Sequence, residues 1–379
     1  MRLLFVTQDF PPDMGGIQTY CWELSARFAQ RRGSFHLIAP TRPNDAEIDA
    51  SRRFPIHRLR TRPDLLGLRA LPFVPRLAHE VAFDVAVHVQ WQTAFTSFLS
   101  RFLTGYPRKI VITLHGRDTV FNPFNIPPLA KGYNALRRTA VSEADLVLPV
   151  SQFLAQRARK FGATAEQVKV ISNATNPDVF YPDPDPSLRA DLGAEDRPLV
   201  LSAGRLVPKK GFDTALRAMD QIRETVPDAL LLIAGDGPER SSLEKLTRSL
   251  DLGNHVHFLG AVPQDELRRY YSTADVFLMA GRQTQGDVEG FGLVFLEANA
   301  CGTPVVGARV GGVPDAIVDG KTGHLVPPED PDATASAVST LLTDPARAAS
   351  MGEQGRARVL TSLNWDAVAD RIYDTLTTL

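Results

Sequence analysis

Cysteine is nearly absent from this sequence, since only Cys21 and Cys301 occur among 379 residues. Neither belongs to a CxxC pair or to a cluster of cysteine and histidine, so we expect no structural zinc site. The two cysteines could form one disulfide, but a reduced protein of the cytoplasm is the simpler interpretation.

Long hydrophobic runs are absent as well. No stretch approaches the ~18 consecutive apolar residues that a helix needs to cross a bilayer. The apolar start at Met1–Val6 is short and is followed closely by Gln8 and Asp9, so it predicts a buried strand and not a signal peptide. These absences favour a soluble protein that is attached to a membrane surface at most.

The net charge of −1 hides an excess of one sign in each half of the chain. Residues 1–180 contain 23 Lys and Arg against 14 Asp and Glu, a net +9, which leaves −10 for residues 181–379. A basic half indicates contact with an anionic molecule, although a chance imbalance between two domains would give the same numbers.

Short apolar runs alternate with amphipathic stretches along the whole chain. Candidate strands include Val85–Val89 and Lys109–Leu114 in the first half and Leu199–Ala203, Leu230–Ala234 and Val276–Met279 in the second, and the last one along the chain is Pro304–Gly307. Many of them are apolar on both faces. Parallel strands covered by helices have this pattern. With helical patterns such as Phe212–Thr225 between the strands, the sequence predicts an α/β protein with doubly wound parallel sheets.

A stretch rich in proline and aspartate, near residues 176–198, interrupts this alternation. Its composition opposes regular structure and suits a connection between domains. We therefore expect an N-terminal domain over 1–180 and a C-terminal domain over 181–364, with a final helix over 365–379 packing back on the first. Two such sheets facing each other would leave a ligand cleft between the carboxyl ends of their strands.

A glycine pair, Gly15-Gly16, follows the first predicted strand and opens a helix. Adjacent glycines let the backbone approach a ligand, and a helix N-terminus offers free N–H groups to an anion. Strand-to-helix turns also use glycine for steric reasons alone, so this motif is weak by itself.

A second glycine-bounded loop, Gly204 to Gly211, follows the first strand of the second half and carries Arg205 and Lys210. Arginine offers a planar fork and lysine a point charge, which together suit a diphosphate. The alternative is a solvated basic loop, and for the neighbouring Lys209 we expect that alternative.

Two acids, Glu289 and Glu297, flank the glycine-rich stretch Gly290-Phe291-Gly292-Leu293. Carboxylates suit hydroxyl-rich ligands because each accepts several hydrogen bonds. On one regular helix the two side chains would point ~80° apart. We therefore expect a loop-to-helix junction between them, with an exposed helix carboxylate as the alternative for Glu297.

His115 stands at the carboxyl end of a predicted strand, in Thr113-Leu114-His115-Gly116-Arg117-Asp118. A single histidine is often structural, but this position directs it toward the predicted cleft.

Together these motifs resemble glycosyltransferase family 4, whose members have the GT-B fold of two Rossmann-like domains facing across a cleft. The resemblance covers essentially the whole chain and rests on Gly204-Arg205-Leu206-x3-Lys210-Gly211 and on Glu289-x7-Glu297 followed by Ala300-Cys301-Gly302-Thr303-Pro304. The stretch Phe10-Pro11-Pro12-x2-Gly15-Gly16-Ile17 resembles the sequence of the phosphatidylinositol mannoside mannosyltransferases that use GDP-mannose.

The resemblance implies a retaining transferase that moves a hexose, with mannose from GDP-mannose preferred, to a hydroxyl acceptor that could be lipid-linked or a glycan. It implies that Arg205 and Lys210 hold the diphosphate, while Glu289 binds the hexose and Glu297 the ribose. His115 would lie beside the sugar. The remaining donor-binding positions would be Gly15, Gly16, Gly204, Gly290, Phe291, Gly292 and Leu293.

The resemblance implies no metal ion or other cofactor, because Arg205, Lys210 and helix N-termini would stabilise the departing diphosphate. The pair Asp183-Pro184-Asp185 lies in the proline-rich connection, in no plausible metal position.

The acceptor side is less defined. Segment 52–79 holds seven arginines and one acid, Asp64, interleaved with apolar residues. It could contact an anionic membrane at the inner face of the cell membrane, or it could be a surface strand and helix with an apolar side in the core. No nucleic-acid-binding module is recognisable.

Several alternatives remain open. One is a family 4 enzyme that uses a UDP-sugar and a small soluble acceptor. Others are a GT-B epimerase or phosphorylase and a non-catalytic nucleotide-sugar binder. A dehydrogenase is disfavoured because Gly235-Asp236-Gly237 lacks the third glycine of the dinucleotide-binding motif.

Overall fold

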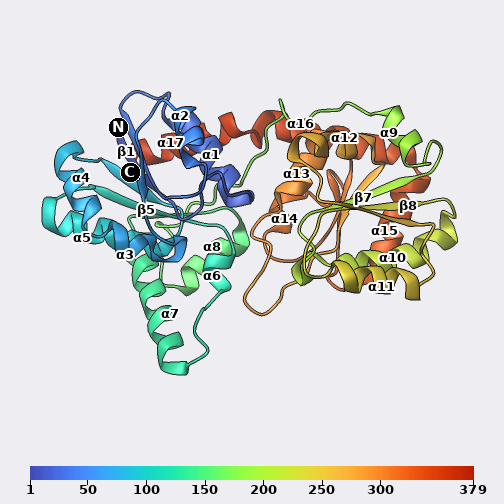
Figure 1. Ribbon diagram of the computed structural model, residues 1–379, viewed down its shortest axis with the longest axis horizontal. Helices are drawn as coiled ribbons and strands as arrows, with labels where there is room; N and C mark the ends of the chain where they lie inside the picture. Colours follow the sequence, from blue (N-terminus) through green and yellow to red (C-terminus); the bar gives the residue numbers. More distant parts are fainter. The chain divides into compact units, whose positions relative to one another are not determined.

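The computed structural model of the protein describes residues 1–379, which cluster into two compact units (Figure 1). Unit 1 comprises Met1–Asn173 together with Trp365–Leu379, and unit 2 comprises Ala174–Asn364. Each unit is an α/β structure with one six-stranded sheet of its own, in which every strand pair is parallel.

The sheet of unit 1 has the strand order β3-β2-β1-β4-β5-β6. In that order its strands are Ile56–Leu59, Ser34–Pro40, Arg2–Val6, Val85–His88, Lys109–Leu114 and Leu146–Pro149. The chain builds outward from β1 in one direction and from β4 in the other. This reversal at β1 and β4 is the topological switch point at which doubly wound sheets bind ligands.

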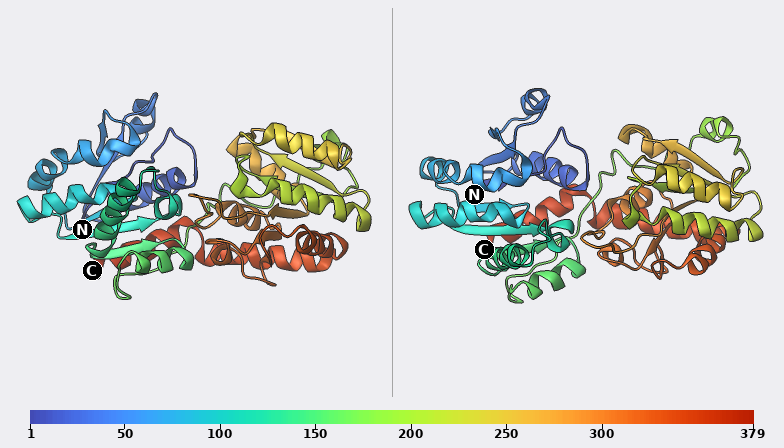
Figure 2. Two further views of the ribbon diagram at one scale, coloured as in Figure 1. Left: turned by 90° about the horizontal axis from the view of Figure 1, so that it is seen from below. Right: turned by 60° about the horizontal axis from the view of Figure 1, so that its bottom comes forward.

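Helices cover both faces of this sheet, because successive side chains of a strand point to opposite faces. Phe5 packs against Phe28 of α1, whereas its neighbours Leu4 and Val6 pack into a cluster with residues of α3 and α4. Figure 2 shows the helices of unit 1 flanking its sheet from two further directions. The helices are α1 (Gly16–Phe28), α2 (Asp45–Ala50), α3 (Leu66–Ala70), α4 (Phe73–Val81), α5 (Ala94–Thr104), α6 (Arg117–Val120), α7 (Pro127–Ser142), α8 (Gln152–Lys160) and α17 (Trp365–Thr377), with short 3-10 turns at η1 (Pro63–Leu65) and η2 (Trp91–Thr93).

The C-terminal helix α17 belongs to unit 1 although the chain reaches it from unit 2. Trp365 is fully buried and its ring lies 6.0 Å from that of Tyr20 on α1. Arg27 of α1 donates to Asp366 at 2.6 Å, so α17 is fixed to α1 by both apolar and ionic contacts.

Unit 2 repeats the strand order of unit 1, as β9-β8-β7-β10-β11-β12. In that order its strands are Val256–Gly260, Leu230–Ala234, Leu199–Ala203, Val276–Met279, Val305–Ala308 and Gly323–Val326. Its switch point therefore lies between β7 and β10. The helices are α9 (Pro186–Asp191), α10 (Phe212–Thr225), α11 (Arg240–Ser249), α12 (Gln264–Thr273), α13 (Leu293–Ala300), α14 (Val313–Ala316), α15 (Pro331–Thr343) and α16 (Pro345–Ser362), with a 3-10 turn at η3 (Pro208–Lys210).

The core of unit 2 forms where α10, α11 and α15 meet the sheet. Phe212, Leu216 and Met219 of α10 are buried there against strand residues such as Val200 and Ile233. The predicted strands at 199–203, 230–234 and 276–279 have the same bounds in the structure. No helix of either unit is both long enough and apolar enough to cross a bilayer.

Candidate active site

The loops that follow β7 and β10 leave the switch point of unit 2, and they carry the motifs that the sequence singled out. The first loop, after Ala203, holds Gly204, Arg205 and the 3-10 turn at Pro208–Lys210. The second runs from Ala280 to Gly292 and ends at the start of α13. The two loops are bonded together, since the amide of Arg282 donates to the carbonyl of Lys209 at 2.8 Å.

Gly211 is the joint that lets these loops pack. Its φ of 68° lies in the left-handed region, where a side chain is strained. A Cβ at this position would also collide with the carbonyl oxygen of Ala280. The glycine therefore sets both the exit of the first loop into α10 and the close approach of the second loop.

Lys210 and Glu289 form an ion pair across the two loops, with 2.7 Å between Nζ and Oε2. The two side chains are only 15% and 20% exposed, so the pair is largely shielded from water. Burial raises the pKa of Glu289, but the charges of Lys210 and Lys209 and the hydrogen bond from Lys210 outweigh burial and hold that pKa below its usual value. Glu289 is therefore an ionised acceptor at neutral pH.

Lys209 was expected to be a solvated loop residue, but the structure shows that it is not. Its ammonium group pairs with Asp287 at 3.1 Å, beside the pair formed by Lys210. Arg205, by contrast, is exposed. The loop therefore presents one exposed cation, Arg205, and one shielded cation, Lys210.

Glu297 lies one turn inside α13, as its position predicted, and remains partly exposed. Gly292 precedes the helix with a φ of 97°, which turns the chain from the loop into α13. The loop-to-helix junction expected between Glu289 and Glu297 is thus present. Burial raises the pKa of Glu297 above its usual value, and a hydrogen bond from Tyr271 and the nearby charge of Lys210 offset this effect only in part.

The start of α13 adds backbone donors to these side chains. The N–H groups of a first helical turn have no partner inside the helix and favour anionic ligands. The turn begins at Leu293, directly after Gly290, Phe291 and Gly292, and Phe291 itself is buried. Unit 2 therefore gathers Lys210, two carboxylates and a helix N-terminus around one switch point.

His115, Gly15 and Gly16 lie in unit 1. His115 follows β5, its Nε2 lies 2.8 Å from the hydroxyl of Thr113, and its ring lies 4.5 Å from that of Tyr20. Burial lowers the pKa of His115 to about 3, so the imidazole is neutral at physiological pH. Gly16 opens α1, which carries Tyr20 one turn later, so the glycine pair and His115 are connected through α1.

Tyr271 is a residue of this region that the sequence motifs did not indicate. It lies on α12, and its hydroxyl donates to Oε2 of Glu297 at 2.9 Å. The sequence shows only a tyrosine in an amphipathic helix, where an apolar core role is the ordinary expectation. No local signal links it to a glutamate 26 residues away.

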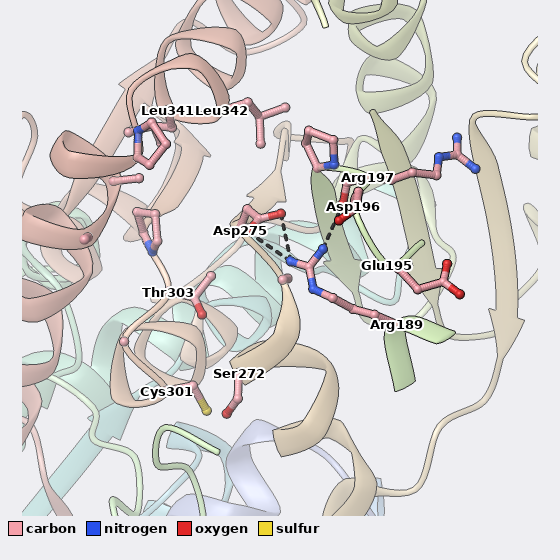
Figure 3. Close-up of a pocket in the computed structure, with 17 residues that line it drawn as sticks. Arg189, Glu195, Asp196, Arg197, Ser272, Asp275, Cys301, Thr303, Leu341 and Leu342 are labelled. Atoms are coloured by element: carbon pink, nitrogen blue, oxygen red, sulfur yellow. Dashed lines mark hydrogen bonds and ion pairs between the residues drawn. The ribbon is translucent and has the colours of Figure 1, made fainter. Parts of the chain in front are cut away.

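A pocket of about 430 Å³ lies at the amino ends of the strands of the same sheet, opposite the ends that carry the loops described above (Figure 3). Its lining includes Pro198, Asp275 and Pro304, which precede β7, β10 and β11. Arg189 points across it to Asp275 at 3.0 Å and also donates to the carbonyl of Arg197 at 2.8 Å. Arg205, Lys210, Glu289 and Glu297 do not line this pocket, whereas the stretch Cys301–Pro304, which follows α13, does.

Comparison with known proteins agrees with this arrangement. Residues 14–179 match the model of Glycosyltransferase Family 4, and residues 185–358 match that of Glycosyl transferases group 1. The GDP-mannose-dependent alpha-(1-6)-phosphatidylinositol monomannoside mannosyltransferase of Mycolicibacterium smegmatis is 36% identical over 99% of this chain and 98% of the relative. The alpha-maltose-1-phosphate synthase of the same organism is 29% identical over 99% of this chain and 98% of that protein.

Solved structures show the same fold. Sucrose-phosphate synthase from Thermosynechococcus elongatus superposes with a TM-score of 0.82 at 26% identity, covering all of both chains. HepE of Anabaena, in complex with UDP, gives 0.84 at 23% identity with the same coverage. The two six-stranded units are thus those of the GT-B fold. The chain belongs to glycosyltransferase family 4, and it is an enzyme that transfers a sugar from a nucleotide-sugar donor.

Proposed function

We propose that this protein transfers mannose from GDP-mannose to a hydroxyl group of a lipid-linked acceptor, with retention of configuration and without a metal ion. The observation that carries the proposal is the gathering of Lys210, Glu289 and Glu297 at the switch point of unit 2. The ion pair of Lys210 and Glu289 and the start of α13 beside it supply both cationic or N–H donors and carboxylate acceptors, the two kinds of group that a nucleotide sugar needs. Cations and N–H groups suit its diphosphate, and carboxylates suit its hydroxyl groups.

In this proposal Arg205 and Lys210 bind the diphosphate, which gains negative charge as the bond to the sugar breaks. Fixed positive charges stabilise that developing charge without reorganisation. Glu289, held ionised by Lys210, accepts from hydroxyl groups of the hexose. Glu297 accepts from the ribose.

Retention follows if the acceptor oxygen attacks the anomeric carbon from the face that the diphosphate leaves. The new bond is then formed between the acceptor oxygen and the anomeric carbon. The acceptor's proton passes to the departing phosphate oxygen, so no residue of the chain must act as the base. His115, being neutral, and the backbone at Gly15, Gly16, Gly204 and Gly290–Leu293 are proposed as donor contacts.

The choice of GDP-mannose rests on the relatives, four of which are named for it at 30–36% identity over 99% of this chain. A thermal-shift series with GDP, UDP and ADP tests it, because a nucleotide that binds the folded state raises the melting temperature. We expect the largest shift with GDP, followed by transfer from GDP-mannose in a direct assay. A larger shift with UDP would contradict the choice of donor.

A UDP-sugar donor is the second candidate. HepE, which has this fold, was solved with UDP, and alpha-maltose-1-phosphate synthase is 29% identical to this chain. An epimerase is a more distant candidate. It would convert the donor with no acceptor present, which NMR of the nucleotide sugar alone would detect.

Contact with an anionic membrane through segment 52–79 is also proposed, and the structure narrows the residues that are free to make it. Arg58 is held by Asp49 at 2.8 Å, and Arg52 lies over the ring of Trp22 at 3.1 Å. The exposed part is centred on η1 and α3, where Leu65 of η1 and Leu68 of α3 are 43% and 67% exposed. The neighbouring exposed arginines are Arg53, Arg60, Arg69 and Arg76, whereas the exposed Arg62 is paired with Asp64 at 3.0 Å.

Sedimentation with vesicles of phosphatidylcholine, with and without phosphatidylinositol, tests this contact. We expect binding only to the anionic vesicles, and we expect salt to weaken it. The double variant Leu68→Gln with Arg69→Gln should bind less, whereas Arg159→Gln, which removes an exposed arginine of α8, should bind normally. Equal binding by both variants would contradict the assignment to this segment.

A cytoplasmic location is proposed as well. Cys21 and Cys301 are both free and buried, which suits a reducing compartment. Cell fractionation would place the protein in the cytosolic and peripheral membrane fractions. Recovery from an extracellular fraction would contradict this location.

A further inference from the structure

Tyr271 is completely buried, yet it carries a polar group that its packing does not require. Its ring lies 5.8 Å from that of Phe180 and 5.4 Å from that of Phe277, in an aromatic cluster beneath α13. None of the side chain is exposed. A phenylalanine would fill the same space, so the hydroxyl group needs a separate explanation.

That explanation is Glu297. The Tyr271 hydroxyl donates to Oε2 of Glu297 at 2.9 Å, and buried tyrosine hydroxyls are expected to have such a partner. Glu297 is partly exposed, so it connects the buried hydroxyl with the outer surface of α13. A hydrogen bond to a carboxylate is stronger than one between neutral groups, so this contact restricts rotation of the carboxylate.

We infer that Tyr271 is a positioning residue for the nucleotide's ribose, because its hydroxyl fixes the orientation in which the Glu297 carboxylate meets the ribose hydroxyl groups. This inference rests on the proposed function, in which Glu297 binds the ribose. A carboxylate has about four acceptor sites, and Tyr271 occupies one of them. The remaining sites can then accept from two neighbouring ribose hydroxyls without a search over rotamers.

The inferred role predicts a specific kinetic pattern. The ribose does not react, so its contacts act mainly on binding of the donor and not on the step that breaks the sugar bond. Removing the Tyr271 hydroxyl leaves the Glu297 carboxylate free to rotate, which weakens its hydrogen bonds to the ribose. We therefore expect KM for the donor to rise by roughly tenfold, the effect of losing one charge-assisted hydrogen bond between Glu297 and the ribose. The substitution should change kcat much less.

Paired nucleotides distinguish this role from a general loss of packing. Calorimetric titration of the full-length wild type with GDP and with 2′,3′-dideoxy-GDP measures its preference for ribose hydroxyls as a ratio of two dissociation constants. We expect the wild type to bind GDP roughly tenfold more tightly, or more. Tyr271→Phe should lose most of that preference while binding dideoxy-GDP as the wild type does. If the wild type prefers uridine nucleotides, UDP and 2′,3′-dideoxy-UDP replace the guanosine pair.

Tyr270→Phe is the matched control. Tyr270 is the adjacent residue of α12, is partly exposed and loses the same oxygen atom in the substitution. It should keep the wild-type preference, and the melting temperatures of the two variants verify that both are folded.

The outcomes separate the inference from the function on which it rests. A wild type that binds neither GDP nor UDP, or that binds the dideoxy nucleotide equally well, overturns the proposed ribose site itself. A wild type with a clear preference that Tyr271→Phe retains overturns only the role of Tyr271. A double-mutant cycle with Glu297→Ala, which removes the acceptor of the Tyr271 hydroxyl, provides a second measurement: in that background Tyr271→Phe should add little, and full additivity would contradict action through Glu297.

Discussion

The ammonium group of Lys210 lies 2.7 Å from the carboxylate of Glu289, although the two residues are 79 positions apart in the chain. The pair joins the loop after β7 to the loop after β10. The contact holds the Glu289 carboxylate ionised beside the Lys210 ammonium in a largely shielded place, where an isolated charge would be unfavourable. A diphosphate can use the positive charge and sugar hydroxyls the negative one.

Replacement of Lys210 tests the importance of this pair. Lys210→Ala removes a fixed positive charge from the departing diphosphate, so kcat/KM for the donor should fall by a factor of about 10²–10³. The control is Lys209→Ala, which removes the neighbouring cation that pairs with Asp287 and should cost far less. Circular dichroism should show that both variants are folded. Near-normal sugar transfer by a folded Lys210→Ala protein would contradict the assignment of the donor site.

Metal dependence is a second test. The charges of Arg205 and Lys210 and the start of α13 are proposed to do what a divalent ion would otherwise do for the diphosphate. We therefore expect the transfer rate to survive dialysis against EDTA. A rate that falls with EDTA and recovers with added magnesium would refute this prediction.

Gly211 supplies a test of how the donor loop is built. Gly211→Ala forces a side chain into a left-handed conformation and against the carbonyl of Ala280. We expect a clearly lower melting temperature and loss of the nucleotide-induced thermal shift, since the two loops can no longer approach. Gly253→Ala is the matched control, because a Cβ there meets no atom within 4 Å. Equal behaviour of the two variants would show that the loop contact is unimportant.

The buried His88 predicts how the stability of unit 1 depends on pH. Its ring nitrogens lie 2.9 Å from the Thr93 hydroxyl and 2.8 Å from the Ser97 hydroxyl, and burial lowers its pKa to about 3. Between that value and the unfolded pKa of about 6.5, the unfolded chain binds more protons than the folded chain. His88 thus contributes stability above pH ~6.5 that is lost as the pH falls toward 3.

Urea unfolding at pH 7 and pH 5 measures this dependence. His88→Gln should be less stable than the wild type at pH 7, but its free energy of unfolding should fall less steeply with acid, by up to ~1.4 kcal/mol per pH unit. His79→Gln, a change at an exposed histidine of the same unit, should keep the wild-type slope. An unchanged pH dependence of the unfolding free energy in His88→Gln would contradict the assignment of this dependence to His88. His115, whose pKa is also lowered to about 3, would then be the other buried histidine of unit 1 that could cause it.

Local patterns predicted most of the fold correctly. Strands such as Leu199–Ala203 and Leu230–Ala234 are apolar on both faces, so periodicity alone located them. The prediction omitted β12 (Gly323–Val326), which is four residues long and stands at the edge of its sheet. A short edge strand containing glycine and histidine has no strong periodic pattern, and only its pairing with β11 defines it.

The sequence by itself determined the alternation of strands and helices, the glycine-bounded loops and the residue types that a nucleotide sugar requires, because these depend on neighbours within a few positions. Only the tertiary structure decided which side chains meet. Lys209 was expected to be solvated and instead pairs with Asp287, and the partner of Glu297 proved to be Tyr271. The physical reason for the first contact is strand order, since the loops after β7 and β10 meet because these strands lie side by side, and for the second it is the packing of α12 against α13. No local pattern encodes either neighbourhood.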